Sequence, residues 1–172
     1  VLQEARDAVD EHAALLQGML SLRGVDVKGI RHAIVASVVP ALTDRIVRAV
    51  KLVCGVDTLV VGPGIKTGMP ILYEDPREVG ADRVVNAVAA YEWLCREHPE
   101  PARRPGCIVV DFGTATTFDC VTPKGEYLGG VICPGIEISA DALFSRTARL
   151  RRVEITPPPK VVGRNAVHSM QS

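Results

Sequence analysis

The stretch from Asp111 to Asp119, Asp-Phe-Gly-Thr-Ala-Thr-Thr-Phe-Asp, combines residue types that can handle a phosphate and a cation. The apolar run 107–110 leads into it and predicts a strand, because Val and Ile favour extended backbone. Gly113 permits a backbone shape that other residues resist, so we expect a turn there. Backbone N–H groups and a threonine hydroxyl in such a turn can face a phosphate, while the Asp111 carboxylate can hold a cation. A plain β-hairpin, with threonines chosen for strand propensity, explains the same residues without a ligand.

A second group of reactive side chains lies at Gly80-Ala81-Asp82-Arg83, just before a helical pattern. The Asp82 carboxylate can accept a proton from an alcohol, and Arg83 can pair with a substrate carboxylate through its fork of donors. Asp82 also lies where a helix N-cap is expected, and capping alone explains an Asp there. A helix N-terminus favours the charged carboxylate and makes Asp82 a weak base, but in phosphoryl transfer the proton is taken late.

A third group consists of glycines, Gly129-Gly130 and, after Pro134, Gly135 at the expected start of a helix. Glycines at a helix start allow a nucleotide to approach the backbone closely. An ordinary strand-to-helix turn is the alternative explanation of this pattern.

The elements that must position these residues alternate between helices and strands. Hydrophobic spacing predicts helices at about residues 2–20, 40–55, 82–96, 136–150 and 165–171, and strands at about 29–39, 58–61, 107–121 and 126–128. The hairpin that begins at Cys107 is antiparallel, so we expect an α/β fold with a mixed sheet flanked by helices. The loop over residues 62–81 is rich in Gly and Pro, and loops of this length are usually functional, so it is a candidate substrate loop.

Composition favours small-molecule chemistry. The 172 residues are 47% hydrophobic and carry 20 basic and 20 acidic side chains, so no basic field attracts nucleic acid. No apolar run is long enough to span a membrane, and acidic residues near the start argue against a signal peptide. The 5 cysteines form no C-x-x-C pair, which predicts a protein of the reducing cytoplasm.

Taken together, the motifs resemble the type III pantothenate kinases of the actin-like and sugar-kinase superfamily. Each motif is weak by itself, but their order and spacing are specific. The segments that carry the resemblance are Ser37-Val38-Val39-Pro40, Gly62-Pro63-Gly64 with Lys66-Thr67-Gly68, Gly80 to Arg83, the Asp111 hairpin, Gly129-Gly130 with Pro134-Gly135, and Gly163-Arg164-Asn165-Ala166-Val167.

The resemblance implies an actin-like ATPase (ribonuclease H-like) fold. Residues 1–106 would be the remainder of the first lobe, with the substrate loop and the Asp82 helix, and residues 107–172 would start the second lobe. It also implies ATP-dependent phosphorylation of pantothenate to 4'-phosphopantothenate, the first step of coenzyme A biosynthesis, with Mg²⁺ and K⁺ or NH₄⁺. A cytoplasmic homodimer is the expected assembly.

The resemblance also implies roles for individual residues. Asp82 resembles the proton acceptor for the pantothenate hydroxyl, and Asp111 the ligand of a monovalent cation. The residues expected to bind substrate are Tyr73, Gly80, Ala81, Asp82, Arg83 and Ala166. Those expected to contact ATP are Gly113, Thr114, Gly129, Gly130 and Gly135.

Departures from the family pattern bear on activity. The family opens with a strand that carries an Asp-x-Gly-Asn-Thr type phosphate motif, which this sequence does not contain between Val1 and Ser172. We therefore expect an incomplete fold and weak or no activity from this sequence as given. Ala166 stands where the family usually has a threonine that touches substrate, in some cases from the partner subunit. The lost hydrogen bond would cost about threefold to tenfold in affinity.

Two other functions are compatible with these residues. One is a non-catalytic regulatory relative of the Bvg accessory factor type, which the absent phosphate strand and Ala166 would fit. The other is a kinase for another small alcohol on the same fold. Arg83 limits that second alternative to alcohols that carry a carboxylate, because a neutral sugar does not require a guanidinium.

Overall fold

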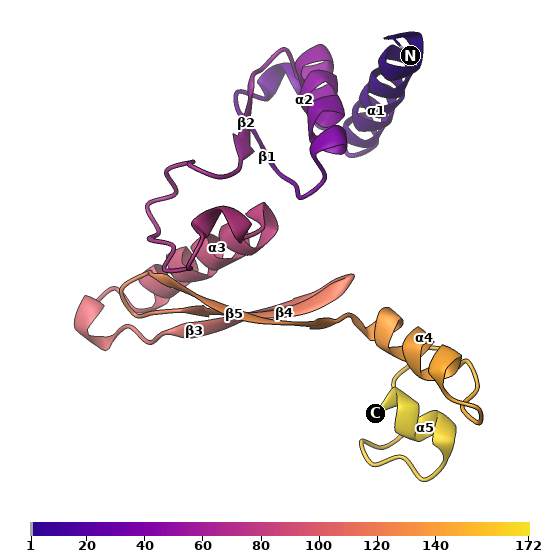
Figure 1. Ribbon diagram of the computed structural model, residues 1–172. Helices are drawn as coiled ribbons and strands as arrows, with labels where there is room; N and C mark the ends of the chain where they lie inside the picture. Colours follow the sequence, from indigo (N-terminus) through magenta and orange to yellow (C-terminus); the bar gives the residue numbers. More distant parts are fainter. Residues whose placement is uncertain (1) are drawn as a thin grey trace.

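The computed structural model describes residues 2–172, with side chains from residue 8 onward; Val1 lies outside the described residues. Helices and strands alternate along the chain, as expected for the α/β class. The elements form an open arrangement, and the two ends of the chain lie far apart (Figure 1). Within the described range, no helix has both the length and the apolar character needed to cross a bilayer.

The first group of elements contains two helices and a small parallel sheet. α1 (Leu2–Leu22) packs against α2 (Pro40–Cys54), which begins with its proline in the first turn and ends at Gly55 in the left-handed conformation. β1 (Ala33–Ala36) pairs in parallel with β2 (Thr58–Val61). β1 is shorter than the strand predicted for residues 29–39: residues 27–29 form a 3₁₀ turn, and pairing with β2 extends only over Ala33–Ala36.

The second group is an antiparallel sheet of order β3-β4-β5. β3 (Cys107–Phe112) and β4 (Ala115–Val121) form the predicted hairpin, with Asp111 opposite Thr117. β5 (Tyr127–Pro134) is longer than the strand predicted for residues 126–128, because its pairing with β4 continues through the glycines up to Pro134. The parallel and antiparallel pairings therefore occur in two separate sheets.

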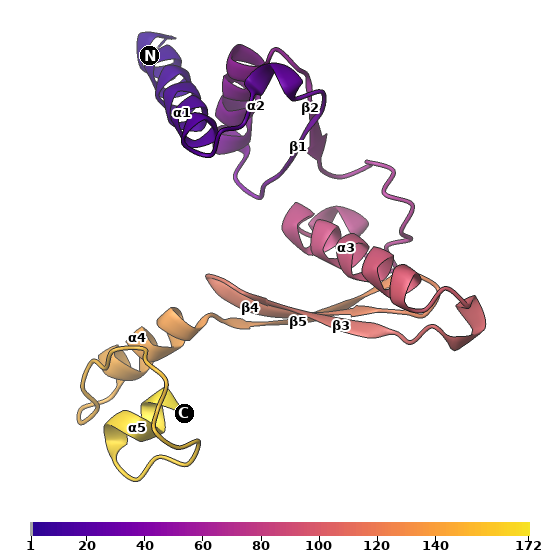
Figure 2. The same cartoon turned by 180° about the vertical axis from the view of Figure 1, so that it is seen from behind.

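α3 (Ala81–Glu97) lies along one face of the antiparallel sheet, between that sheet and the first group of elements (Figure 2). Alternation along the strands directs every second side chain to this face. The buried core between α3, the sheet and the preceding loop consists of Met69, Val79, Ala87, Val121 and Tyr127. The apolar side chains on the opposite face of the sheet are exposed in the described structure; they are Ile108, Val110, Phe112, Phe118 and Val131.

Two further helices lie beyond the end of the sheet at which β5 leads into α4 (Figures 1 and 2). α4 (Ile136–Arg146) begins directly after β5, and α5 (Ala166–Gln171) is short. α4 ends before the predicted boundary at residue 150, because Thr147 adopts an extended conformation. Asn165 caps α5 by accepting a hydrogen bond from the backbone N–H of His168.

Candidate active site

The start of α3 positions Asp82. Gly80 is the N-cap and the helix begins at Ala81, so the prediction of Asp82 as the N-cap is wrong: Asp82 is the second residue of the helix. A Cβ on Gly80 would lie 2.5 Å from Asp82 Oδ1 and 3.3 Å from Val38 Cγ1, so this cap position has little room for a side chain. Asp82 itself is exposed, and its Oδ1 accepts a hydrogen bond from the Arg83 N–H at 2.9 Å. The carboxylate is thus accessible to a ligand.

Arg83 points in a different direction, into the junction between α3 and the sheet. Its Nε donates to Asp119 Oδ1 at 2.9 Å, and its Nη2 donates to the same oxygen. The Tyr127 hydroxyl also donates to this oxygen at 2.7 Å, and Thr117 Oγ1 donates to Oδ2 at 3.2 Å. Asp119 is only 1% exposed, so its charge is compensated entirely by these buried donors.

Tyr73 completes this group of side chains. Backbone bonds from Tyr127 N–H to the Pro70 carbonyl (2.9 Å) and from Leu72 N–H to the Tyr127 carbonyl (2.8 Å) join its segment to β5. The Tyr73 and Tyr127 ring centroids are 6.5 Å apart, and the Arg83 guanidinium carbon lies 5.8 Å from the Tyr127 centroid. We call these five residues (Tyr73, Arg83, Thr117, Asp119 and Tyr127) the Arg83 cluster.

The environment of the Arg83 cluster stabilises a charged guanidinium and a neutral phenol. Burial alone would lower the pKa of Arg83, but the hydrogen bonds and charge of Asp119, with smaller contributions from Tyr127 and Tyr73, raise that pKa overall. Burial, followed by the hydrogen bond and the charge of Asp119, raises the pKa of Tyr127 above its usual range. Tyr127 therefore remains a hydrogen-bond donor at neutral pH.

Two of the predicted nucleotide-binding glycines lie against the Arg83 cluster. Gly129 has a φ of 116°, and a Cβ there would lie 3.2 Å from the Tyr73 ring. A Cβ on Gly130 would lie 2.1 Å from the Phe118 carbonyl oxygen and 2.8 Å from Asp119 Oδ1. In this structure these glycines let Tyr73 and Asp119 pack closely on β5, and their contact with ATP stays a prediction.

Asp111 also faces α3. Its Oδ2 accepts a hydrogen bond from Asn86 Nδ2 at 2.8 Å, and no residue of the described chain donates to its Oδ1. Among the side chains described, no group of three or more His, Cys, Asp or Glu is arranged to hold a metal ion. The part of the site that the structure describes thus offers one half-buried carboxylate, with one oxygen available, to the predicted monovalent cation.

The turn between β3 and β4 is exposed. Gly113 does not have a positive φ, and a Cβ there would lie 3.6 Å from the Ala115 carbonyl oxygen, an ordinary contact; the expectation that this turn needs glycine for its backbone shape is wrong. Gly135 is the constrained residue, because its Cβ would lie 2.2 Å from the Gly113 carbonyl oxygen and 2.5 Å from that of Thr114. The N–H groups of Gly113 and Gly135 are bonded to the Ala115 and Thr114 carbonyl oxygens, each at 2.9 Å.

The Thr114 side chain is exposed, and no described residue forms a hydrogen bond with its hydroxyl. Beside it lies a cavity of about 510 Å³ between the turn and the start of α4. Its lining includes Phe112, Thr116, Ile136 and Glu137. A ligand in this cavity would meet the Thr114 side chain and the first turn of α4.

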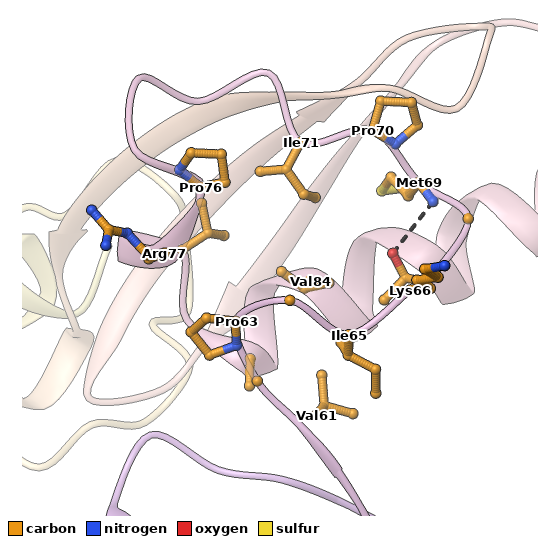
Figure 3. Close-up of a pocket in the computed structure, with 16 residues that line it drawn as sticks. Val61, Pro63, Ile65, Lys66, Met69, Pro70, Ile71, Pro76, Arg77 and Val84 are labelled. Carbon is orange, nitrogen blue, oxygen red and sulfur yellow. Dashed lines mark hydrogen bonds between the residues drawn. The ribbon is translucent and has the colours of Figure 1, made fainter.

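The candidate substrate loop encloses a separate cavity of about 410 Å³ (Figure 3). Its walls are mostly apolar and come from the loop and the first turn of α3, where Ala81 and Val84 lie on one helix face. Asp82 and Arg83 do not line it. At its edge, the exposed Arg77 forms a two-pronged ion pair with Asp75 (2.9 and 2.8 Å).

The structure does not bring Ala166 to the other predicted substrate residues. Ala166 is the first residue of α5 and is exposed beside Arg149, Arg151 and His168. α5 lies beyond the end of the sheet, away from α3, in both views (Figures 1 and 2). Within one protomer, Ala166 is therefore not part of the Arg83 cluster.

The sequence prediction assigned no role to Asn86, Asp119, Tyr127 or Thr117. One signal was present: Asp119 alternates with Thr117 and Val121 along a strand, which places a charged residue on a core-facing position. A buried carboxylate requires a cation or several donors, so a partner was to be expected. The identity of that partner, 36 residues earlier in the chain, could not be read from local pattern.

The fold and this arrangement define an α/β protein in which a buried arginine cluster lies beside a hairpin that carries Asp111 and Asp119. A family model described as type III pantothenate kinase matches residues 1–172. The chain belongs to this family, whose fold is that of the actin-like ATPases, in agreement with the mixed helices and sheets observed.

Individual relatives agree with the family match. A type III pantothenate kinase of Myxococcus xanthus is 53% identical over 167 residues, which cover 97% of this chain and 62% of that protein. The type III pantothenate kinase of Moorella thermoacetica is 49% identical over 172 residues, covering 100% of this chain and 64% of that protein. One from an Anaeromyxobacter species is 54% identical over 164 residues, covering 95% and 61% respectively. The chain thus spans about three fifths of the length of these relatives.

Proposed function

We propose that the full-length protein phosphorylates pantothenate with ATP, as the first step of coenzyme A biosynthesis. The observation that carries this proposal is the arrangement at the start of α3. An exposed carboxylate, Asp82, is adjacent in sequence to an arginine held beside Tyr73 by buried contacts. Pantothenate carries an alcohol and a carboxylate, which are the groups that these side chains recognise.

The roles of the chain's own residues follow from their positions. Arg83, with Tyr73, binds the carboxylate end of pantothenate, and the exposed Asp82 orients the hydroxyl and accepts its proton late in the transfer. The Asp82 carboxylate lies in the first turn of α3, a position where acidic side chains are favoured. ATP supplies the phosphoryl group.

We assign the predicted nucleotide contacts to the exposed side of the hairpin. Thr114 and the adjacent cavity can accommodate part of a nucleotide, and the free Oδ1 of Asp111 suits a monovalent cation such as K⁺ or NH₄⁺. Mg²⁺ belongs with the ATP phosphates, and the described residues alone form no cage for it. Gly135 supports this side by allowing α4 to start directly against the turn.

We further propose a cytoplasmic homodimer in which residues 1–106 belong to the first lobe and residues 107–172 begin the second. The separation of Ala166 from the Arg83 cluster supports the dimer, because α5 could contact a substrate at that cluster only in another copy of the chain. The 5 cysteines are all free thiols, which is consistent with a reducing compartment.

The deciding experiment is a coupled assay of ADP release by the full-length protein, with and without pantothenate and with K⁺, NH₄⁺ or Na⁺. We expect release that depends on pantothenate and is stimulated by K⁺ or NH₄⁺. ADP release with another carboxylate-bearing alcohol but not with pantothenate would indicate a different substrate. No release with any such alcohol would favour the regulatory alternative.

A further inference from the structure

The Arg83 guanidinium is hydrogen-bonded along one edge only. Its Nε and Nη2 both donate to Asp119, whereas no residue of the described chain accepts a hydrogen bond from Nη1. A guanidinium has five N–H donors in a fixed plane, so fixing the Nε–Nη2 edge also fixes the direction of Nη1. Arg83 is 8% exposed, and the side chain therefore has little freedom to adopt other rotamers.

Asp119 is the group that fixes this edge. A buried guanidinium without a counter-charge is strongly unfavourable, so Arg83 without Asp119 would turn toward water. Asp119 is itself held by the Tyr127 hydroxyl at 2.7 Å and by Thr117, which leaves its carboxylate no alternative orientation.

Tyr127 contributes in two ways. It is fully buried, its hydroxyl binds Asp119, and its ring lies under the guanidinium, 5.8 Å from the centroid to the Arg83 carbon. The backbone of Tyr127 also pairs with residues 70–72 and so places Tyr73 next to the same guanidinium. One residue thus connects the arginine, its counter-ion and the loop that carries Tyr73.

From these contacts we infer that Asp119 and Tyr127 are positioning residues that aim the free edge of Arg83 at the carboxylate of the substrate. Neither residue has to touch the substrate. Their contribution is selectivity for a carboxylate-bearing alcohol over its neutral analogue, since only the carboxylate needs a correctly aimed guanidinium. The inference rests on the proposed function.

The test compares pantothenate with its neutral primary amide in the full-length protein. Dissociation constants are measured by calorimetry and kcat and KM by ADP release, for the wild type, Asp119→Asn and Tyr127→Phe. We expect both variants to weaken pantothenate binding about tenfold, mainly through KM, and to change binding of the amide less than about twofold. Tyr127→Phe retains the ring and the charges, so it gives an answer even if Asp119→Asn folds poorly.

Matched controls exist elsewhere in the chain. Tyr91 accepts a hydrogen bond from Arg104 Nη1 at 2.8 Å, and the Arg104 guanidinium carbon lies 5.4 Å from its ring centroid, so Tyr91→Phe removes a hydrogen-bonded hydroxyl from another ring that an arginine covers. Asp57 pairs with Lys51 at the surface, and Asp57→Asn repeats the loss of a paired carboxylate. Neither control should change the preference for pantothenate over the amide.

Three results in the variants would overturn the inference. An equal loss of affinity for both ligands would mean that the cluster is merely structural, and unchanged affinity for both ligands would mean that Arg83 needs no positioning. Tighter pantothenate binding by Asp119→Asn would mean that Asp119 only offsets the positive charge of Arg83. If the wild type binds pantothenate but releases no ADP, the kinase proposal fails. The ratio of the dissociation constants for pantothenate and the amide then still decides whether Asp119 and Tyr127 position Arg83. If the wild type binds neither ligand, both proposals fail.

Discussion

The junction between α3 and the sheet differs from the Gly113–Thr114 turn in how its groups are held. At the junction, side chains from distant parts of the chain are buried and bonded to one another, as Arg83 and Asp119 are. At the turn, the contacts are between backbone groups of neighbouring strands and the start of α4. The junction therefore depends on particular side chains, whereas the turn depends on the space that Gly135 leaves.

This difference matches what each region is proposed to bind. A substrate with a defined carboxylate and hydroxyl needs charged groups at fixed angles, which buried pairing provides. A phosphate accepts hydrogen bonds from many directions, so an exposed hydroxyl such as that of Thr114 can serve it without being fixed by buried partners. Four tests, each built on one or two substitutions, address the comparison.

The largest expected effect is that of Asp82→Asn on turnover. Asp82 is exposed near the start of α3, and its carboxylate accepts a hydrogen bond only from the Arg83 N–H among the described residues. Replacing the carboxylate should therefore leave folding nearly intact. Removing a general base typically lowers kcat by about 10²–10⁴. The measurement is kcat for ADP release together with the thermal midpoint; wild-type turnover in this variant would leave Asp82 with a purely electrostatic role at the helix start.

The second effect is on stability. Asp119→Ala leaves Arg83 buried without its counter-charge and should lower the free energy of unfolding by about 3–5 kcal/mol. Asp57→Ala removes one partner of the exposed Lys51–Asp57 pair and should change that free energy very little. Urea titrations of both variants check this. Equal, small effects would show that the Arg83–Asp119 pair is not integral to the junction.

The third test separates two glycines at the turn. Gly135→Ala places a Cβ against two carbonyl oxygens of the turn and should cost about 1–3 kcal/mol of unfolding free energy. Gly113→Ala meets only an ordinary contact at 3.6 Å and should have a much smaller effect. Denaturant curves of the two variants give the comparison directly. Similar losses would mean that Gly113 is also constrained.

The smallest effect concerns pH and tests the buried phenol of the junction. The pKa of Tyr127 is raised in the folded state, so the unfolded chain loses this proton first as pH rises above about 10. The contribution of Tyr127 to stability is therefore complete below that pH and decreases above it, by up to about 1.4 kcal/mol per pH unit.

Tyr127→Phe removes this dependence. The difference in unfolding free energy between wild type and Tyr127→Phe, measured from pH 8 to 11, should be constant at first and then shrink. Tyr91→Phe, at the half-buried Arg104 pair, serves as the reference. A constant difference across the whole range would show that Tyr127 ionises as readily in the folded protein as in the unfolded one.

Much of the fold could be predicted because its determinants are local. The helices at residues 40–54 and 81–97 and the hairpin at 107–121 follow from hydrophobic spacing, Pro40 and the β-branched residues. The boundaries of β5 and α4 were wrong. The length of β5 is set by its pairing with β4, and α4 ends where Thr147 becomes extended. Strand pairing in particular depends on partners that local patterns do not identify.

The residues of the candidate site, like the elements of the fold, could be predicted in part. Residue types and motif order identified Asp82, Arg83 and Asp111 as candidates, and the family match supports the resemblance on which their roles depend. The prediction assigned the need for glycine in the turn to Gly113, but the structure assigns it to Gly135, which closely approaches the carbonyl oxygens of the turn. The supporting residue Asn86 was not predicted, since its contact with Asp111 spans 25 residues.

The amino-acid sequence by itself determined the alternation of helices and strands, the family and the chemical groups available to the site. These depend on local backbone preferences and on the order of motifs along the chain. Only the tertiary structure decided which of those groups are buried and bonded to other side chains and which remain exposed. Packing α3 on the sheet buries Arg83 against Asp119 and Tyr127 and leaves Asp82 exposed. The physical reason is that a buried charge is stable only beside a partner, and that partner can lie far away in the sequence.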